Sequence, residues 1–355
     1  MTASNPAGTP REHGFHMPAE WARHTATWIA WPHNADDWPG KFQAIPWAYA
    51  DIVRHLSSVE DVHILVNDAA AEKRARGVLT RSGITLQRVH FHQWPTNRVW
   101  MRDSGPIFLK NARGETAITN WKFNAWAKYD DWQLDDQVPD HVAGLVGLPE
   151  WKPTVGEHRV VLEGGSIDAN GAGLLLTTEE CLLSDVQQRN PGLSREDLER
   201  AFHDYLGIER VIWLNRGIAG DDTHGHVDDI TRFVGENTIV TAIEPNPDDE
   251  NYEPLQENLQ RLKSARNLGG GEFEIVEVPM PAPVEFGGRR LPASYANFYI
   301  ANNLVLVPTF NDPNDRKALS VLANIFPGRR VTGIHCGDFI WGLGALHCMT
   351  QQQPF

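Results

Sequence analysis

A cysteine near the end of the chain has surroundings that are typical of a reactive thiol. Cys348 lies in GLGALHCMTQQQPF, directly after His347 and seven residues before the C-terminus. The glycines of this segment allow its backbone to approach a ligand closely. Most free cysteines are buried and behave as small hydrophobic residues. A thiol that follows a glycine-rich segment and adjoins a histidine instead suggests an exposed nucleophile.

Charged residues interrupt three segments that are otherwise apolar. Arg102 and Asp103 lie in VWMRDSGPIFL, Glu163 lies in VVLEGGSID, and His226 and Asp228 lie in DDTHGHVDD. Burying a charge is costly unless the charge is paired or used. A local salt bridge or a glycine turn would explain any one of these segments. All three together, with the cysteine, indicate a functional site.

The residue types define the chemistry that such a site could perform. A thiol attacks an electrophilic carbon, and a histidine can give a proton to a leaving group and then take one from water. Three carboxylates beside a thiol oppose its ionisation unless the substrate brings a compensating positive charge. A planar guanidinium, whose N–H donors match carboxylates in pairs, meets this requirement. The set therefore favours a cationic guanidinium substrate.

The surrounding pattern repeats a strand, a turn, a second strand, a helix and a further strand. Glycine or asparagine occupies each turn, as hairpins require. Helices are expected at 198–207 after a capping sequence at Ser194, at 253–271, at 315–328 and, more weakly, at 68–83. The expected strands are 25–32 and 62–67 around a helix at 51–59, and the pairs 99–110 with 116–123, 160–168 with 174–178, 225–233 with 238–243, and 293–300 with 304–310.

The candidate residues recur at similar places in these units. Arg102, Glu163 and His226 are 61 and 63 residues apart, near the start of the first strand of their units. This spacing exceeds that of most solenoid repeats and suits a propeller-like array around one central cavity. No proline- or serine-rich linker divides the chain, so we expect a single domain over residues 15–355, preceded by a disordered N-terminus at 1–14.

Composition limits the class of protein and of partner. The chain has 355 residues, 41% of them hydrophobic, and a formal net charge of −14, which is globular composition unsuited to nucleic acid. A negative field attracts small cations. The absence of a signal segment and of long apolar runs predicts a cytoplasmic protein without a membrane partner, and three cysteines without framework spacing predict no disulfides. A homo-oligomer is left open.

Four motifs in this order give the chain a resemblance to a known family. WMRDSGP, EGGS, HGHVDD and HCMTQQQP resemble the agmatine deiminase family, which is grouped with the bacterial peptidylarginine deiminases in the guanidine-modifying superfamily. The resemblance extends from MPAEW at 17–21 to the C-terminus. It implies an α/β fold, a five-bladed α/β-propeller of ββαβ units with pseudo-fivefold symmetry.

The resemblance also implies a role for each residue. Cys348 would be the nucleophile, His226 the general acid and base, and Asp103 and Asp228 the carboxylates that hold the guanidinium, while Glu163 would orient and charge His226. The reaction implied is the hydrolysis of agmatine to N-carbamoylputrescine and ammonia through a covalent thiouronium on the cysteine. It requires no cofactor and no metal.

The residues that would bind the far end of the substrate are less clearly indicated. In the agmatine enzymes, positions equivalent to Trp100 and Asp222 lie near the distal amine. The chain reads THGHVD where those enzymes often read TDGHVD, so His224 replaces an acid. This departure leaves the reaction in place but keeps free arginine and peptidyl arginine open as substrates. Trp121 and Trp126 could line the cleft, although core packing is expected for at least one of them.

Two readings from other classes remain. The cluster from His224 to Asp229 resembles a metallohydrolase box without its final histidine, in which His224, His226 and Asp228 would bind zinc or iron. A non-catalytic propeller that only binds ligands would keep the fold without the chemistry, but an intact cysteine, histidine and carboxylate set argues against it. Cys181 and Cys336 are expected to be buried in the core.

Overall fold

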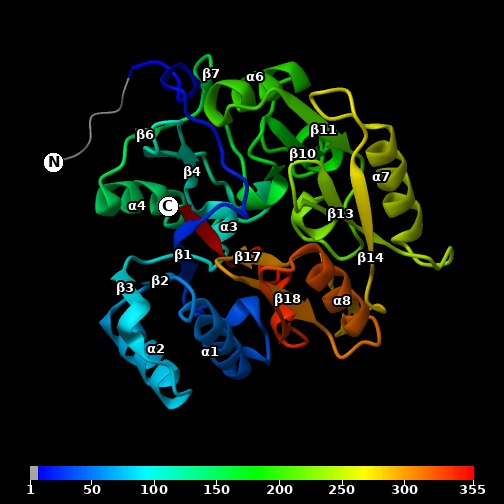
Figure 1. Ribbon diagram of the computed structural model, residues 1–355. Coiled ribbons are helices and arrows are strands. Elements are labelled where there is room, and N and C mark those ends of the chain that lie inside the picture. Colours follow the sequence, from blue (N-terminus) through cyan, green and yellow to red (C-terminus); the bar gives the residue numbers. More distant parts are fainter. Residues whose placement is uncertain (1–6) are drawn as a thin grey trace.

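Small sheets with helices outside them make up the computed structural model, which describes residues 7–355 (Figure 1). Within this range the strands form one four-stranded sheet, four three-stranded sheets and two two-stranded hairpins, and none of these sheets closes into a barrel. Helices α1, α2, α4, α6, α7 and α8 lie toward the outside of the molecule. The expectation of a mixed α/β fold is confirmed.

The three-stranded sheets share one plan. A central strand pairs antiparallel with the strand before it and parallel with the strand after it, and the parallel connection contains a helix, as parallel pairing requires. The four sheets are β4 (Ile107–Lys110), β5 (Thr116–Thr119) and β6 (Glu150–Trp151); β9 (Asp168–Ala169), β10 (Leu174–Thr178) and β11 (Arg210–Leu214); β12 (Thr231–Phe233), β13 (Thr238–Ile243) and β14 (Glu274–Pro279); and β17 (Tyr299–Ala301), β18 (Leu304–Thr309) and β19 (Arg330–His335).

The four-stranded sheet joins the two ends of the chain. Its order is β20 (Gln351–Pro354), β1 (His24–Ala30), β2 (Asp61–Val66) and β3 (Val89–Gln93). The C-terminal strand β20 pairs antiparallel with β1, so it takes the place that the preceding hairpin strand has in the other sheets. The sequence pattern had given the first unit no such partner.

The helices follow the expected signals and pack their apolar sides inward. Ser194 and Asp197 form a reciprocal capping box at the start of α6, and Gly207 ends the helix in a left-handed conformation. Ile52, Val53 and Leu56 of α1 share one core with the strands of the four-stranded sheet. The helices are α1 (Ile45–Leu56), α2 (Ala69–Arg81), α3 (Met101–Ser104), α4 (Val138–Val146), α5 (Glu179–Leu183), α6 (Arg195–Leu206), α7 (Tyr252–Ser264) and α8 (Asp315–Ile325).

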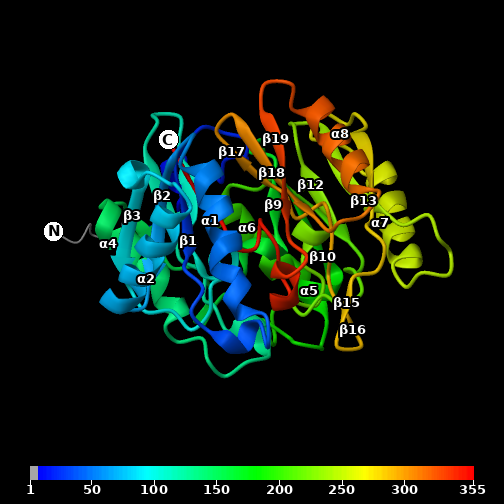
Figure 2. The ribbon, with the colours of Figure 1, turned by 90° about the horizontal axis from the view of Figure 1, so that it is seen from below.

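Short elements connect these units. Figure 2 shows the hairpin β15–β16 at the lower edge of the molecule. The hairpins are β7 (Thr154–Val155) with β8 (His158–Arg159), and β15 (Glu285–Phe286) with β16 (Arg289–Arg290). The 3-10 turns are η1 (Arg11–His13), η2 (Ala35–Asp37), η3 (Phe42–Ala44), η4 (Leu86–Arg88), η5 (Ala125–Ala127), η6 (Asp135–Gln137), η7 (Gly164–Ser166), η8 (Val227–Asp229) and η9 (Phe339–Gly342).

The N-terminal segment lies partly outside this description. Of the residues expected to be disordered, 1–6 lie outside the described residues. From there on the chain contacts the domain: Arg11 forms an ion pair with Glu209 at 2.6 Å, and Trp151 Nε1 donates to the carbonyl of Gly8 at 3.0 Å. Within residues 7–355, none of the helices combines the length and the apolar character needed to cross a membrane.

Candidate active site

The predicted site residues lie in short turns that precede the first strands of the sheets. Asp103 lies in α3 ahead of β4, Glu163 comes directly before η7 and β9, and His226 and Asp228 lie at η8 ahead of β12. Cys348 lies just before β20. The expectation that the first three segments begin as strands is therefore wrong by a few residues. A turn can direct a polar side chain beyond the end of a sheet, whereas a strand interior would bury it between apolar neighbours.

His226 occupies the centre of the inner cluster. Its Nδ1 lies 3.8 Å from Asp103 Oδ1, and its Nε2 lies 3.7 Å from Glu163 Oε2. Burial by itself lowers the pKa of the imidazole, but Asp103 and Glu163 outweigh it and hold the pKa well above its ordinary value. A Cβ on Gly165 would lie 2.6 Å from His226 Nδ1 and 2.7 Å from Asp103 Oδ1, so only glycine fits between them.

Glu163 is fixed as a carboxylate behind His226. Arg189 Nε donates to its Oε1 at 3.1 Å, and both side chains are fully buried. Burial raises the pKa of Glu163, but the charges of Arg189 and His226 prevail and lower it to about 2. Cys181 joins this group, because its sulfur and the ligating atoms of Glu163 and His226 lie within 4.8 Å of one another. Its burial was predicted, but its place beside His226 was not.

Asp103 is the carboxylate at the base of the cavity. Its Oδ2 accepts a hydrogen bond from Trp126 Nε1 at 2.9 Å, and its Oδ1 accepts one from the backbone of Gly165 at 3.2 Å. Burial and the neighbouring carboxylates raise its pKa to about 7, against the opposite effects of His226 and Trp126. Residues Ala125–Ala127 all have positive φ, a strained conformation that directs Trp126 to this contact.

The two tryptophans considered for the cleft have different places. Trp126 lines the cavity, whereas Trp121 packs against Phe202 and Tyr205 in a separate core. Trp121 Nε1 donates to the hydroxyl of Thr119 at 3.1 Å. Core packing for at least one of the two was expected, and Trp121 is the one that lies away from the cavity.

The Cys348 thiol faces an amide and several carboxylates. Asn297 Nδ2 lies 3.0 Å from Sγ, and Asp228 Oδ2 lies 3.7 Å from it. Burial and the charges of Asp228, Asp229 and Asp103 raise the pKa of the thiol well above its ordinary value. Although it was expected to be exposed, Cys348 is buried at the wall of the cavity. Asn297 was missed; its only signal was an amide inside an otherwise apolar segment.

A cavity of about 350 Å³ leads from the surface to the thiol. Its wall includes Trp100, Asp103, Trp126, Asp222 and Cys348. His226, Glu163 and Asp228 lie behind this wall and are fully buried. Gly344 brings the backbone against Trp100: a Cβ there would come within 2.7 Å of the indole and 3.1 Å of Cys348 Cβ.

Asp222, expected to meet a distal amine, is already paired. It accepts hydrogen bonds from Lys128 Nζ at 2.7 Å, Tyr129 Oη at 2.7 Å and Arg289 Nη2 at 2.8 Å. Burial raises the pKa of Asp222, but these partners outweigh it and lower the pKa. The two cations come from segments far from Asp222 in sequence, and sequence reasoning missed both.

His224 does not face this cavity. Its Nε2 lies 3.3 Å from Ser184 Oγ and its Nδ1 lies 3.9 Å from Glu180 Oε1, where it lines a separate surface hollow. The metallohydrolase interpretation, which needs His224 beside His226 and Asp228, is therefore not supported. Among the described residues, His226 and Asp228 belong to two different groups of side chains able to bind a metal, and His224 belongs to neither.

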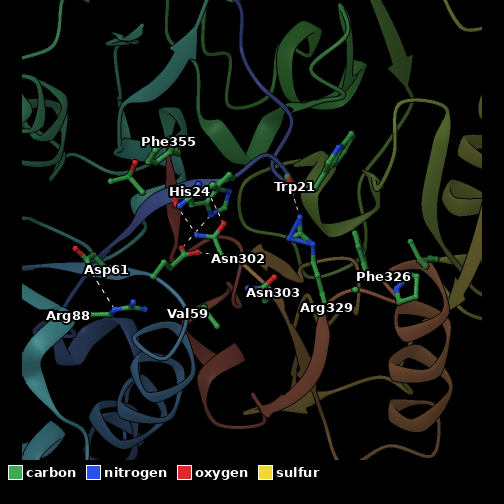
Figure 3. Close-up of a pocket in the computed structure, with 16 residues that line it drawn as sticks. Trp21, His24, Val59, Asp61, Arg88, Asn302, Asn303, Phe326, Arg329 and Phe355 are labelled. Carbon is green, nitrogen blue, oxygen red and sulfur yellow. Dashed lines mark hydrogen bonds and ion pairs between the residues drawn. The ribbon is translucent and has the colours of Figure 1, made fainter. Parts of the chain in front are cut away.

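A larger hollow, of about 870 Å³, lies elsewhere on the molecule (Figure 3). Within the described part of the chain, none of the predicted site residues lines it. Charged groups of its wall pair with one another or with the backbone: Arg88 Nε lies 3.9 Å from Asp61 Oδ1, and Arg329 donates to the carbonyl of Trp21 at 2.7 Å. The smaller cavity is the one that leads to Cys348.

Comparison with known proteins agrees with this arrangement. Residues 16–354 match the family described as Porphyromonas-type peptidyl-arginine deiminase. Agmatine deiminase of Ectopseudomonas mendocina is 37% identical over 98% of this chain and 97% of the relative. The structure of Enterococcus faecalis agmatine deiminase is 30% identical over 99% of both chains, with a TM-score of 0.91. A cysteine-to-serine variant of C. jejuni agmatine deiminase with substrate bound is 29% identical over 96% of both chains, with a TM-score of 0.84.

Proposed function

We propose, from the premise that the chain belongs to the Porphyromonas-type peptidyl-arginine deiminase family, that it hydrolyses agmatine to N-carbamoylputrescine and ammonia. The observation that carries this proposal is a thiol and a carboxylate, Cys348 and Asp103, on the wall of one cavity, with Asp228 3.7 Å behind the sulfur. The similar proteins named agmatine deiminases, one with substrate bound, support the choice of substrate.

In this proposal the guanidinium lies between the carboxylates of Asp103 and Asp228. Asp103 holds one side of the plane and Asp228 the other, because carboxylates match guanidinium N–H groups in pairs. Asp228 Oδ1 has no hydrogen-bond partner among the described residues. The bound cation offsets the negative charges that raise the pKa of the Cys348 thiol, so substrate binding favours the thiolate.

The reaction then has two halves. The Cys348 thiolate attacks the guanidinium carbon, and His226 gives a proton to the departing nitrogen, which leaves as ammonia. The product of this half is a thiouronium on the cysteine. His226, now neutral, takes a proton from water, which attacks the same carbon and releases the ureido product. Glu163 orients His226 and sustains its positive charge, in keeping with the raised pKa of the imidazole.

The distal part of the cavity would hold the alkyl chain and the ammonium of agmatine. Trp100 covers the chain, and Asp222 is the nearest proposed acceptor for the ammonium. Free arginine is a second candidate, because Lys128 and Arg289 beside Asp222 could receive a carboxylate. The identity and coverage of the curated agmatine deiminases favour agmatine.

We also propose that residues 15–355 form a single domain, a five-bladed α/β-propeller with the site on its axis. The five sheets of three or four strands would be the blades, and each would contribute residues ahead of its first strand. Free thiols at all three cysteines favour a reducing compartment such as the cytoplasm.

A substrate panel tests the proposed activity. Purified enzyme is given agmatine, free arginine or an arginyl peptide, with and without excess EDTA, and ammonia and ureido product are measured. Agmatine should have the highest kcat/KM, and EDTA should change nothing. Faster turnover of arginine or of the peptide would contradict the assignment of agmatine. Loss of activity on chelation, restored by zinc, would contradict the cysteine mechanism.

A further inference from the structure

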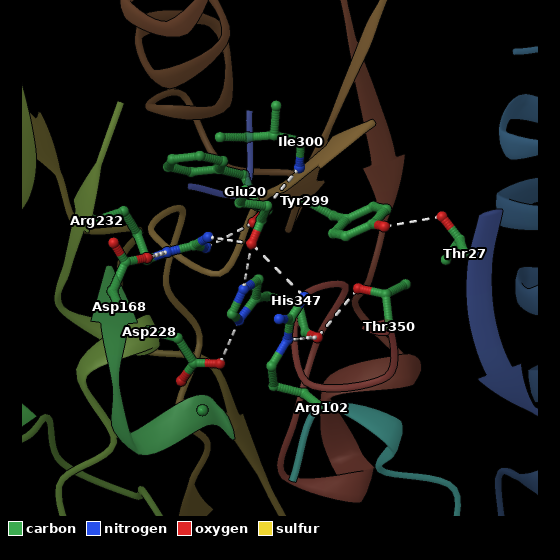
Figure 4. Close-up of polar contacts among 12 residues, drawn as sticks. Glu20, Thr27, Arg102, Asp168, Asp228, Arg232, Tyr299, Ile300, His347 and Thr350 are labelled. Carbon is green, nitrogen blue, oxygen red and sulfur yellow. Dashed lines mark hydrogen bonds and ion pairs between the residues drawn. The ribbon is translucent and has the colours of Figure 1, made fainter. Parts of the chain in front are cut away.

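A buried chain of alternating acidic and basic side chains leads to Asp228 of the site (Figure 4). It links segments from four parts of the sequence, and each link is an ion pair. Arg232 Nη2 lies 2.7 Å from Glu20 Oε2, His347 Nε2 lies 2.7 Å from the same oxygen, and His347 Nδ1 lies 2.7 Å from Asp228 Oδ2. Beyond Arg232, its Nε donates to Asp168. Negative and positive side chains alternate in the order Asp168, Arg232, Glu20, His347, Asp228.

The hydrogen bonds of His347 depend on which of its ring nitrogens carry protons. A neutral imidazole donates one N–H and accepts at its other nitrogen. Both ring nitrogens of His347 lie within hydrogen-bond distance of a carboxylate, and a carboxylate that is ionised can only accept. Burial raises the pKa of both acids, but Arg232 and His347 lower that of Glu20, and His347 lowers that of Asp228. Where both acids are ionised, each ring nitrogen needs a proton to complete its hydrogen bond.

This buried histidine adjoins the reacting groups. His347 directly precedes Cys348, and its backbone N–H donates to Asn297 Oδ1 at 2.9 Å, while the amide nitrogen of Asn297 lies 3.0 Å from the sulfur. The charged groups around the ring are Asp228 from η8, Glu20 from the N-terminal segment and Arg102 from α3, whose Nη2 lies 3.6 Å from Glu20. With His347 on Asp228 Oδ2, the other oxygen, Oδ1, is left for the guanidinium.

We propose that His347 is a positioning residue, which Glu20 holds in place and which keeps Asp228 ionised and turned toward the substrate. His347 acts through Asp228 and does not touch the substrate. This inference rests on the proposed function, because it assigns to Asp228 the task of binding an amidine or guanidinium cation. It adds two residues, Glu20 and His347, to those that the reaction depends on.

The test compares two alkylating probes that differ only at the group Asp228 would recognise. Chloroacetamidine carries an amidinium, and chloroacetamide is its neutral analogue with the same leaving group. The rate constants for alkylation of Cys348 are measured with each probe in the wild type, in His347→Gln and in His24→Gln. His24 is a matched control, since it is also buried and also contacts Glu20, through the Glu20 carbonyl at 2.7 Å.

The expected result is a loss of selectivity. His347→Gln should lower the ratio of the amidine rate to the amide rate by about ten- to a hundredfold, the effect of one charge-assisted hydrogen bond. His24→Gln should leave the ratio unchanged. General damage to the site would slow both probes equally, and an unchanged ratio in a folded His347→Gln protein would overturn the proposal.

A second variant covers the case in which His347→Gln does not fold, which circular dichroism would detect. Glu20→Gln removes the charge that holds the outer nitrogen and should lower the same ratio in a folded protein; an unchanged ratio there would also overturn the proposal. The probes require no turnover, so failure of the wild type to hydrolyse agmatine would contradict the proposed function without affecting this result.

Discussion

The inner and outer carboxylates of the cavity have different partners. Among the described residues, the ion pairs of Asp103 and Asp228 are with histidines, His226 and His347. Asp222, at the outer end, pairs with Lys128 and Arg289. Each inner acid has one histidine partner, and Asp228 Oδ1 has no hydrogen-bond partner among the described residues, whereas the outer acid pairs with two cations. Under the proposed function, this difference separates the residues that carry the reaction from those that select the substrate.

Burial also makes electrostatic interactions stronger at the inner acids than at the outer acid. The side chains of Asp103 and Asp228 are 2% and 0% exposed, so their charges act in a medium that screens them weakly. The side chains of Lys128 and Arg289 are 37% and 48% exposed, and exposed ion pairs contribute little. Changes at the inner end should therefore reduce kcat strongly, and changes at the outer end should alter KM with little effect on kcat.

The largest effect is expected at the nucleophile. Cys348→Ser should lower kcat by at least about a thousandfold with the fold intact, because a hydroxyl is a far weaker nucleophile than a thiolate. Cys336→Ser, at another fully buried cysteine, is the matched control and should keep its activity. Activity above a few per cent in Cys348→Ser, measured by ammonia release, would show that Cys348 is not the nucleophile.

The next effect concerns Asp103 and pH. Asp103 must be ionised to hold a guanidinium, and its pKa of about 7 means that kcat/KM should fall as the pH drops below about 7. In the complex the substrate cation lowers that pKa, so the acid limb of kcat should lie at lower pH. Asp103→Asn should lower kcat severely and remove this limb.

The control for this measurement is a second buried acid. Asp135 also has a pKa raised to about 7 by burial, but it accepts backbone N–H groups of Asn97 and Arg98 and does not itself line the cavity. Asp135→Asn should therefore retain the acid limb of kcat/KM. A limb that is lost in Asp135→Asn and kept in Asp103→Asn would reverse the assignment.

A smaller effect is expected at the outer acid. Asp222→Asn should raise KM for agmatine with little change in kcat, a loss in kcat/KM of roughly ten- to a hundredfold for one charge-assisted contact. Butylguanidine, which lacks the ammonium, is the matched substrate, and its kcat/KM should be the same in Asp222→Asn as in the wild type. An equal loss with both substrates would show that Asp222 supports the loop rather than the ammonium.

The smallest effect should come from the cation that competes for Asp222. Arg289→Gln removes one exposed partner and should lower KM for agmatine about two- to fivefold, in line with the weak contribution of such pairs. Arg290→Gln, at the neighbouring hairpin residue paired with Asp249, should leave KM unchanged. A higher KM for agmatine in Arg289→Gln would mean that Arg289 assists binding.

Local sequence patterns predicted part of the fold and most of the candidate site residues. The capping residues of α6, the hairpin turns and the order of the four motifs are properties of neighbouring residues, and the polar residues stood out because apolar segments surround them. These signals identified Cys348, His226, Glu163, Asp103 and Asp228 before any contact between them was known. They could not give the exact ends of the strands, since a short turn and a strand start share the same residue preferences.

Contacts between distant segments could not be predicted in this way. The pairing of β20 with β1 joins the two ends of the chain, and its residues carry no local sign of each other. Asn297 beside Cys348 and Arg289 beside Asp222 likewise depend on how separate sheets pack. Whether a charged side chain can bind a substrate depends on the ion pairs that it already makes. The pairing of Asp222 with two cations was therefore known only from the structure.

The central claim is a covalent bond between Cys348 and the substrate carbon, and rapid quenching tests it most directly. Enzyme and agmatine are mixed, quenched in acid during turnover, digested and examined by mass spectrometry. The peptide that contains Cys348 should carry an added mass equal to agmatine less ammonia, and the adduct should disappear when substrate is exhausted. Turnover without any adduct, or an adduct on Cys181 or Cys336 instead, would contradict the account.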